Sequence, residues 1–106
     1  MFALLVLTLP ALAQTRLGTL SGTVTLRDTG DPLHNATVLL VALGRSVHTG
    51  EDGKYEFRQV PAGTYKVVAH LDNTLTDEVQ AVEIREGAAT QADFRLRIGV
   101  LRQEIV

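Results

Sequence analysis

The chain has 106 residues, a formal net charge of −2 and no cysteine. A length of this order holds one domain, and charges of both signs scattered along it provide no field that would hold nucleic acid or an anionic membrane. The lack of cysteine in the sequence excludes disulfide bonds, thiolate metal sites, cysteine nucleophiles and acylated cysteine.

Residues 1–13 form an almost wholly apolar segment, which becomes polar at Gln14. About a dozen apolar residues are too few for a helix that crosses a hydrocarbon core of roughly 30 Å. Ala11 and Ala13 give the small-x-small pattern that signal peptidase requires. We therefore predict a signal peptide over residues 1–13, cleavage between Ala13 and Gln14, and export. Because no Lys or Arg precedes the apolar segment, we expect the true start to lie upstream or the basic region to have been lost. The alternative is an apolar N-terminal strand.

After the apolar segment, polar and apolar residues alternate with a period of two, which is typical of half-buried strands. Residues 19–27 follow this pattern, and residues 28–35 are rich in turn-forming residues and predict a loop. Residues 36–43 predict a strand with two apolar faces. Such a strand is either covered on both sides or binds a partner. Leu39 and Val41, on its outward side, are therefore candidate interaction residues.

Residues 45–49 predict a short strand, and Asp52-Gly53 predicts a hairpin turn, because glycine accepts a positive φ. A β-turn is predicted at residues 60–63, between a strand that begins near residue 54 and another that ends near residue 71. Both strands place aromatic residues on their inward side: Tyr55, Phe57 and Tyr65. We interpret these aromatics as core anchors of two adjacent strands, each burying on the order of 150–250 Å².

Two further strands are predicted, over residues 78–86 and 89–98. In the second, the alternation places four apolar residues inward: Ala92, Phe94, Leu96 and Ile98. The chain thus shows about seven short strands separated by turn residues, and no helical stripe after the apolar start. This pattern predicts an all-β fold, a seven-stranded antiparallel β-sandwich.

Four motifs together resemble the carboxypeptidase regulatory-like domain. They are Gly22/Val24, Pro32/Ala36/Val38, Thr49/Gly53/Tyr55/Phe57 and Pro61/Gly63/Tyr65. The resemblance covers residues 17–98 and implies a transthyretin-like (prealbumin-like) sandwich with Greek-key connections. As a signal of fold it is specific. It indicates little about function, because this domain is an accessory in many unrelated proteins.

A signal peptide, this domain and the ending "LRQEIV" also resemble the start of Oar-like TonB-dependent receptors of the bacterial outer membrane. In those receptors the domain lies in the periplasm, and a segment like Glu-x-Val-Val-Thr-Ala (the TonB box region) leads into the plug and barrel. Glu104, Ile105 and Val106 stand where that segment would begin. We interpret residues 99–106 as an exit segment and the chain as a fragment or truncated product of such a receptor. The alternative is a generic apolar C-terminus.

Residues that carry chemistry are scattered along the chain. His34, His48 and His70 fall in different predicted segments, none at metal-ligand spacing to another. His48 or His70 could converge with Asp72 or Asp77, but surface histidines on strands are the simpler interpretation. The paired acids beside turns are interpreted as solvated loop charge, and Ser21 and Ser46 lack the setting of a nucleophile. We predict no enzyme, no catalytic residue, no metal and no cofactor.

Three functions remain open from the sequence. The leading hypothesis is a non-enzymatic exported accessory domain that contacts a protein partner, either in the periplasm or in its own downstream barrel. The second is a free-standing secreted module that binds carbohydrate or peptide. Carbohydrate is weakly supported, because the chain has no Trp and its other aromatics after the start fall at inward positions. The third is a passive folding or spacer domain.

Overall fold

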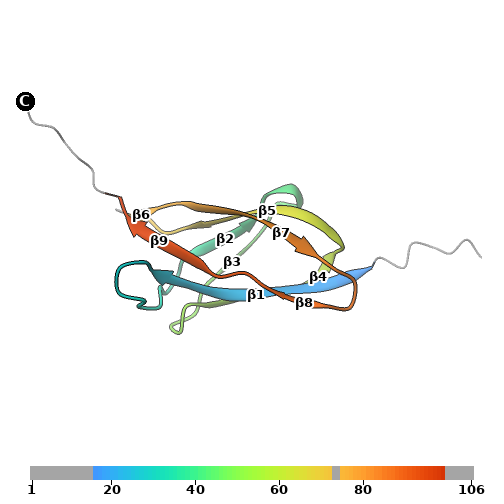
Figure 1. The fold of residues 1–106 in the computed structure, drawn as a ribbon, viewed down its shortest axis with the longest axis horizontal. Coiled ribbons are helices and arrows are strands. Elements are labelled where there is room, and N and C mark those ends of the chain that lie inside the picture. Colours follow the sequence, from blue (N-terminus) through green and yellow to red (C-terminus); the bar gives the residue numbers. More distant parts are fainter. Residues whose placement is uncertain (1–15, 73–74, 100–106) are drawn as a thin grey trace, which may run out of the picture.

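The computed structural model describes residues 16–72 and 75–99, which form two β-sheets packed face to face (Figure 1). The described residues contain nine strands and one short 3₁₀ helix: β1 (Leu17–Leu26), β2 (Thr37–Leu40), η1 (Val41–Leu43), β3 (Arg45–His48), β4 (Lys54–Pro61), β5 (Gly63–His70), β6 (Leu75–Thr76), β7 (Glu78–Ile84), β8 (Ala89–Gln91) and β9 (Phe94–Ile98). The prediction of an all-β sandwich is confirmed.

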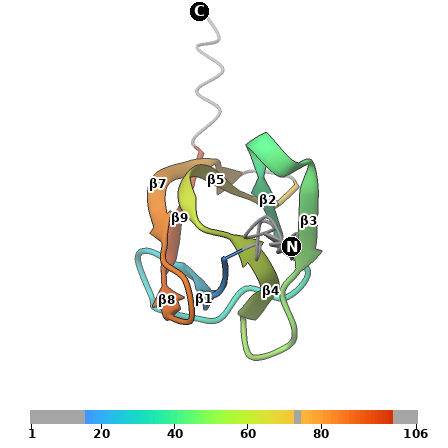
Figure 2. The same cartoon turned by 90° about the vertical axis from the view of Figure 1, so that its right-hand side faces the viewer.

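One sheet has the strand order β4-β1-β9-β6, with β8 also paired to β1, and the other has the order β3-β2-β5-β7. We call them the β1 sheet and the β5 sheet. The end-on view in Figure 2 shows the two layers, with β1 and β8 on one side and β5 and β7 on the other. Each sheet turns one side chain in two toward the space between them, as the alternation predicts.

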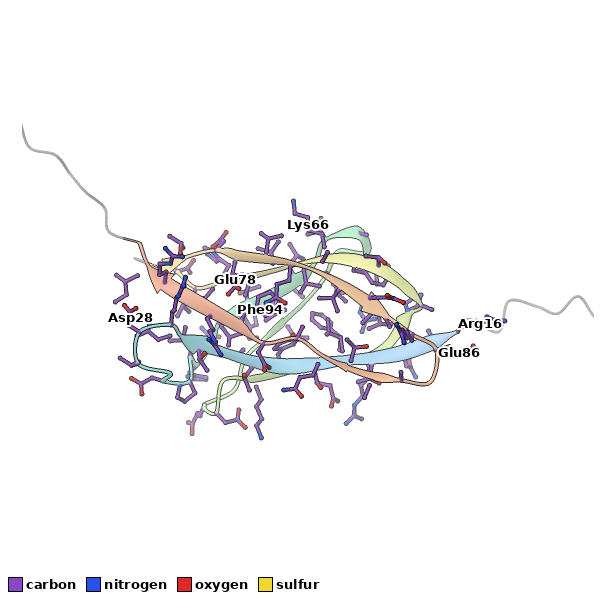
Figure 3. All side chains as sticks on the ribbon, in the orientation of Figure 1. Arg16, Asp28, Lys66, Glu78, Glu86 and Phe94 are labelled. Atoms are coloured by element: carbon purple, nitrogen blue, oxygen red, sulfur yellow. The ribbon has the colours of Figure 1, made fainter. Side chains whose placement is uncertain are left out.

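Sixteen apolar side chains fill that space: Leu20, Val24, Ala36, Val38, Leu40, Tyr55, Phe57, Val60, Tyr65, Val67, Ala69, Val82, Ile84, Ala92, Phe94 and Leu96. The aromatics form its centre, where the Tyr55 ring lies 6.1 Å from those of Phe57 and Phe94, measured between centroids. Figure 3 shows Phe94 between the two layers. All four aromatics predicted to point inward are therefore buried. Ile98 was wrongly predicted to do so: it ends β9 beside the two-residue β6 and is 47% exposed.

The count of seven strands and the fully antiparallel arrangement differ from the structure. Residues 89–98 form two strands, and both β8 and β9 run parallel to β1, in one continuous register. The break falls at Ala92 and Asp93. There the Asp93 carboxylate accepts a hydrogen bond from the Thr23 amide at 3.0 Å, in place of a backbone carbonyl. The other strand that was not predicted is β6, which among the described residues pairs with β9.

The Asp52-Gly53 turn is present, but it does not make a hairpin. The Lys54 amide donates to the Asp52 carboxylate at 3.1 Å, and Gly53 has a φ of 74°. However, β3 belongs to the β5 sheet and β4 to the β1 sheet, so the turn carries the chain between layers. The turn before Gly63 does the same between β4 and β5. The aromatic strands β4 and β5 are thus consecutive in sequence but belong to different sheets.

The predicted strand over residues 36–43 is shorter than expected. β2 ends at Leu40, and residues 41–43 form η1. The reason is the pairing of β2 with β3, which sets Leu40 opposite Arg45 and leaves four residues for the reversal. Gly44 completes that reversal with a φ of 61°, and its amide donates to the Val41 carbonyl at 3.2 Å. Val41 is therefore a residue of η1 and not of a strand.

Side chains close the two open sides of the sandwich. On one side Arg45 of β3 reaches β4, where its guanidinium donates to the carbonyls of Arg58 at 2.7 Å and Gln59 at 3.1 Å. On the other side Gln80 of β7 donates to the Asp93 carbonyl at 2.6 Å, and Glu78 accepts from the Arg95 amide at 2.5 Å. These contacts satisfy backbone groups that neither sheet pairs.

Candidate interaction surfaces

The outer face of the β5 sheet carries a row of apolar side chains across three neighbouring strands. Leu39 of β2 pairs with Val68 of β5, and Val68 pairs with Val79 of β7. Residues directly opposite in antiparallel strands point to the same side. Their neighbours Val38, Val67 and Ala69 are buried, so the row faces away from the core. We call Leu39, Val68 and Val79 the outer apolar row.

The exposure of this row differs along its length. Leu39 and Val68 are half-buried because neighbouring strands flank them, whereas Val79 lies on the edge strand and is 51% exposed. Val41 and Leu43 lie on η1, which packs beside β5. Their apolar side chains are 44% and 36% exposed, respectively. Exposed apolar side chains gathered on one face are typical of contact surfaces.

The structure therefore places the predicted interaction residues as follows. Leu39 lies in the outer apolar row, and Val41 lies on η1 next to it. Ala13 and Gln14, the predicted cleavage site, and Glu104, Ile105 and Val106, the predicted start of the TonB box region, lie outside the described residues. Those predictions stay predictions.

Sequence reasoning missed Val68 and Val79. The signal was present, because the same alternation that points Val67, Ala69, Val82 and Ile84 inward places Val68 and Val79 outward. Apolar residues at outward positions of three strands indicate a surface only once the strand order is known. The sheet order β2-β5-β7 is what makes a row of them.

His70 does converge with two acids. Its Nε2 lies 2.8 Å from an Asp72 oxygen, and its Nδ1 lies 2.5 Å from an Asp77 oxygen. The hydrogen bond to Asp77, and then the one to Asp72, raise the pKa of the imidazole above its usual value. In the protonated imidazolium form, both ring nitrogens donate to carboxylates. Within residues 16–72 and 75–99, this group and the other His, Asp and Glu side chains lack the arrangement that could hold a metal ion.

A shallow polar depression of about 760 Å³ lies where β1 and β4 meet the edge of β3. Its lining includes Ser21, Thr23, Lys54, Glu56 and Gln91. Hydroxyl, amide and charged groups of this kind form hydrogen bonds with polar ligands. The depression has no exposed aromatic face, since Tyr55, which also lines it, is only 4% exposed.

The described part of the chain contains no helix of the length and apolar character needed to cross a bilayer. Two sheets packed over one core define the protein as a small β-sandwich domain. It belongs to the carboxypeptidase regulatory-like domain family, whose sequence model matches residues 19–97. Human carboxypeptidase D is 35% identical over 69 residues, which cover 65% of this chain and 5% of that protein. The chain thus corresponds to a small part of this relative.

Solved structures share the fold at low sequence identity. The Bacillus anthracis TIE protein matches with a TM-score of 0.65 and 19% identity, over 78% of this chain and 17% of that one. A type II cohesin–X-dockerin complex from Acetivibrio cellulolyticus matches with a TM-score of 0.59 and 22% identity, over 74% and 56%. A Bacteroides uniformis protein described as a candidate carbohydrate-binding protein matches with a TM-score of 0.55 and 15% identity, over 74% and 40%.

Proposed function

We propose that this protein is a non-enzymatic accessory domain that acts by protein contact. The observation that carries the proposal is the outer apolar row, with Val41 and Leu43 beside it. Burying apolar surface of this kind contributes about 25 cal/mol per Å². The family assignment agrees with such a role, because the matched domain is regulatory-like and the matching stretch covers 5% of human carboxypeptidase D.

The occupant of this surface is a neighbouring domain of the same polypeptide. This choice is supported by the share of each relative that the sandwich covers, from 5% of carboxypeptidase D to 56% of the cohesin complex chain. In each case the sandwich is one part of a longer chain. A sheet face held against its own neighbour gains affinity from the high effective concentration that a linker provides.

The wider context is an exported protein, with the domain at the N-terminal, periplasmic end of a TonB-dependent outer-membrane receptor. The apolar start, with Ala11 and Ala13 at signal-peptidase spacing, supports export. The resemblance of residues 104–106 to the start of a TonB box region supports the receptor. Reading the genomic DNA past the codon for Val106 tests it. A frame that continues into a plug and barrel supports the receptor, and an immediate stop codon overturns it.

The contact surface is tested by thiol labelling, since residues 1–106 contribute no thiol of their own. Val79→Cys places a thiol on the proposed surface, and Lys54→Cys, on the exposed side of β4 in the other sheet, is the control. We expect Val79→Cys to react with a maleimide at least about tenfold more slowly in the longer polypeptide than in the isolated domain. A tenfold ratio corresponds to about 1.4 kcal/mol of additional free energy needed to expose the thiol. Lys54→Cys should react at the same rate in both. Equal rates for Val79→Cys in both forms would overturn the proposal.

Carbohydrate binding is a second candidate, favoured by the polar depression on the β1 sheet and by the description of the Bacteroides uniformis neighbour. A glycan array probed with the wild-type domain and with Gln91→Ala separates the two functions. Binding that Gln91→Ala removes would support the sugar site. An array without signal would reject it and leave the contact role standing.

A further inference from the structure

The outer face of the β1 sheet ends in three arginines, two on β9 and one directly after β1. Arg95 and Arg97 of β9 point outward, because they alternate with the buried residues Phe94 and Leu96. Arg27 follows the last residue of β1, and its amide donates to the Leu96 carbonyl at 2.9 Å. This bond continues the register of β1 with β9 and brings Arg27 level with Arg97. We call Arg27, Arg95 and Arg97 the arginine cluster.

The cluster lines an open depression of about 430 Å³ together with Thr76, Asp77 and Glu78. Both acids there already have partners. Glu78 accepts the Arg95 amide at 2.5 Å, and Asp77 lies 2.5 Å from His70 Nδ1. Within the described residues, no arginine of the cluster has a carboxylate within ion-pair distance, whereas Arg16, Arg58 and Arg85 each have one. The three guanidinium groups are therefore open to an external anion.

This arrangement works against folding. Like charges on adjacent positions of neighbouring strands repel one another and destabilise a sheet. Along β1 the side chains of the same face are neutral, namely Thr19, Ser21, Thr23 and Thr25, whereas β4 carries Arg58 paired with Glu56. Threonine at the cluster positions, a residue enriched in strands, would remove this repulsion. The cluster thus has an energetic cost that a bound anion would relieve.

The spacing of the cluster indicates the shape of that anion. Arg95 and Arg97 are two positions apart on one strand, so their Cα atoms lie about 6.5–7 Å apart. An extended peptide with acidic residues at alternate positions presents carboxylates on one side at the same interval. Each guanidinium can hold a carboxylate with two hydrogen bonds. We propose that the arginine cluster binds an extended acidic segment of a partner protein, with carboxylates at alternate positions laid along β9.

Two synthetic peptides test this proposal with the isolated domain. Both contain three glutamates, four threonines and two terminal glycines, with glutamates two apart in one and three apart in the other. Fluorescence anisotropy measures their affinities. We expect the first peptide to bind at least about fivefold more tightly, and its affinity to fall as salt is raised. Arg95→Gln and Arg97→Gln should each weaken it by a similar factor.

Arg85→Gln is the matched control, since Arg85 is an exposed arginine that directly follows β7 of the β5 sheet and already pairs with Glu83 at 3.2 Å. It should leave the affinity unchanged. Four results would overturn the proposal: no binding of the first peptide, equal binding of both peptides, equal weakening by Arg85→Gln, or full competition by inorganic phosphate at the same concentration. The last would identify a site for small anions. Because this face belongs to the β1 sheet, Val79→Cys on the β5 sheet leaves the result unaffected, so the two proposals fail separately.

Discussion

The hydroxyl group of Tyr55 donates a hydrogen bond to the carbonyl oxygen of Ala92, across the strand that separates them. That strand is β1, on which Gly22 pairs with Tyr55 and lies beside Ala92. A side chain at Gly22 would overlap the Ala92 carbonyl, so only glycine leaves the path open. The bond thus ties β4 to the break between β8 and β9. Burial, and then the charge of Asp93, raise the pKa of Tyr55, which keeps its hydroxyl neutral and able to donate.

Tyr55→Phe should reduce the free energy of unfolding by about 1–3 kcal/mol, because it leaves a buried carbonyl without its donor. Urea denaturation followed by circular dichroism measures this change. A Tyr55→Phe variant as stable as the wild type would show that the Ala92 carbonyl finds another partner.

Arg45 joins the two sheets at a β-bulge. The register of β1 with β4 shifts between Gly18 and Leu20, and Gln59 takes a φ of 53° there. The Arg45 guanidinium binds the carbonyls of Arg58 and Gln59 at this bulge and lies 5.7 Å from the centroid of the Phe57 ring. A planar fork can hold both carbonyls at once, but a lysine ammonium cannot.

Arg45→Ala should therefore lower the free energy of unfolding by about 1.5–3 kcal/mol, and Arg45→Lys should recover less than half of the loss. Thermal unfolding of both variants measures the difference. Arg85→Ala, which removes an exposed arginine paired only with Glu83, should change stability by at most about 1 kcal/mol. An Arg45→Lys variant as stable as the wild type would contradict the role of the fork and leave charge alone as the cause.

Much of this fold is predictable from the sequence because alternation identifies which side chains share a face. It places Tyr55, Phe57, Tyr65 and Phe94 inward, and all four are buried. Alternation carries no information on which strands pair. Asp52-Gly53 has the local chemistry of a hairpin turn, yet the sheet assignment of β3 and β4 depends on contacts distant in sequence. The bulge at Gln59 and the parallel pairing of β9 with β1 likewise depend on contacts between residues that are distant in sequence.

The candidate surfaces were predictable only in part, for the same reason. Leu39 stands out because it lies in a strand with two apolar faces. Val68 and Val79 become its neighbours only through the order β2-β5-β7. Arg27 is nearly seventy positions from Arg95 and Arg97 in the sequence, so their cluster follows from the parallel register of β1 with β9. Strand pairing decides both surfaces.

Thr49 is a buried polar residue that supports the loop before β2. It is 3% exposed, and its hydroxyl accepts a hydrogen bond from the Ala36 amide at 2.9 Å and donates one to the Leu33 carbonyl at 2.5 Å. Thr49→Val, which has nearly the same shape, should cost about 1–3 kcal/mol because it leaves a buried amide unpaired. Thr49→Ser keeps the hydroxyl and should cost less. Chemical denaturation compares them, and a Thr49→Val variant more stable than Thr49→Ser would refute the role of the hydroxyl.

His70 should make stability depend on pH in a defined direction. Hydrogen bonds to Asp77 and Asp72 raise the pKa of the folded imidazole above 6.5, its value in the unfolded chain. The stabilisation is therefore fully present below pH 6.5 and is lost as pH rises through the higher folded pKa. Because His70 and both acids are exposed, the effect should stay below about 1 kcal/mol. Melting temperatures of wild type and His70→Gln, measured from pH 5.5 to 9, should differ most at low pH and converge at high pH. A difference that grows with pH would reverse the sign and refute the charged pairing.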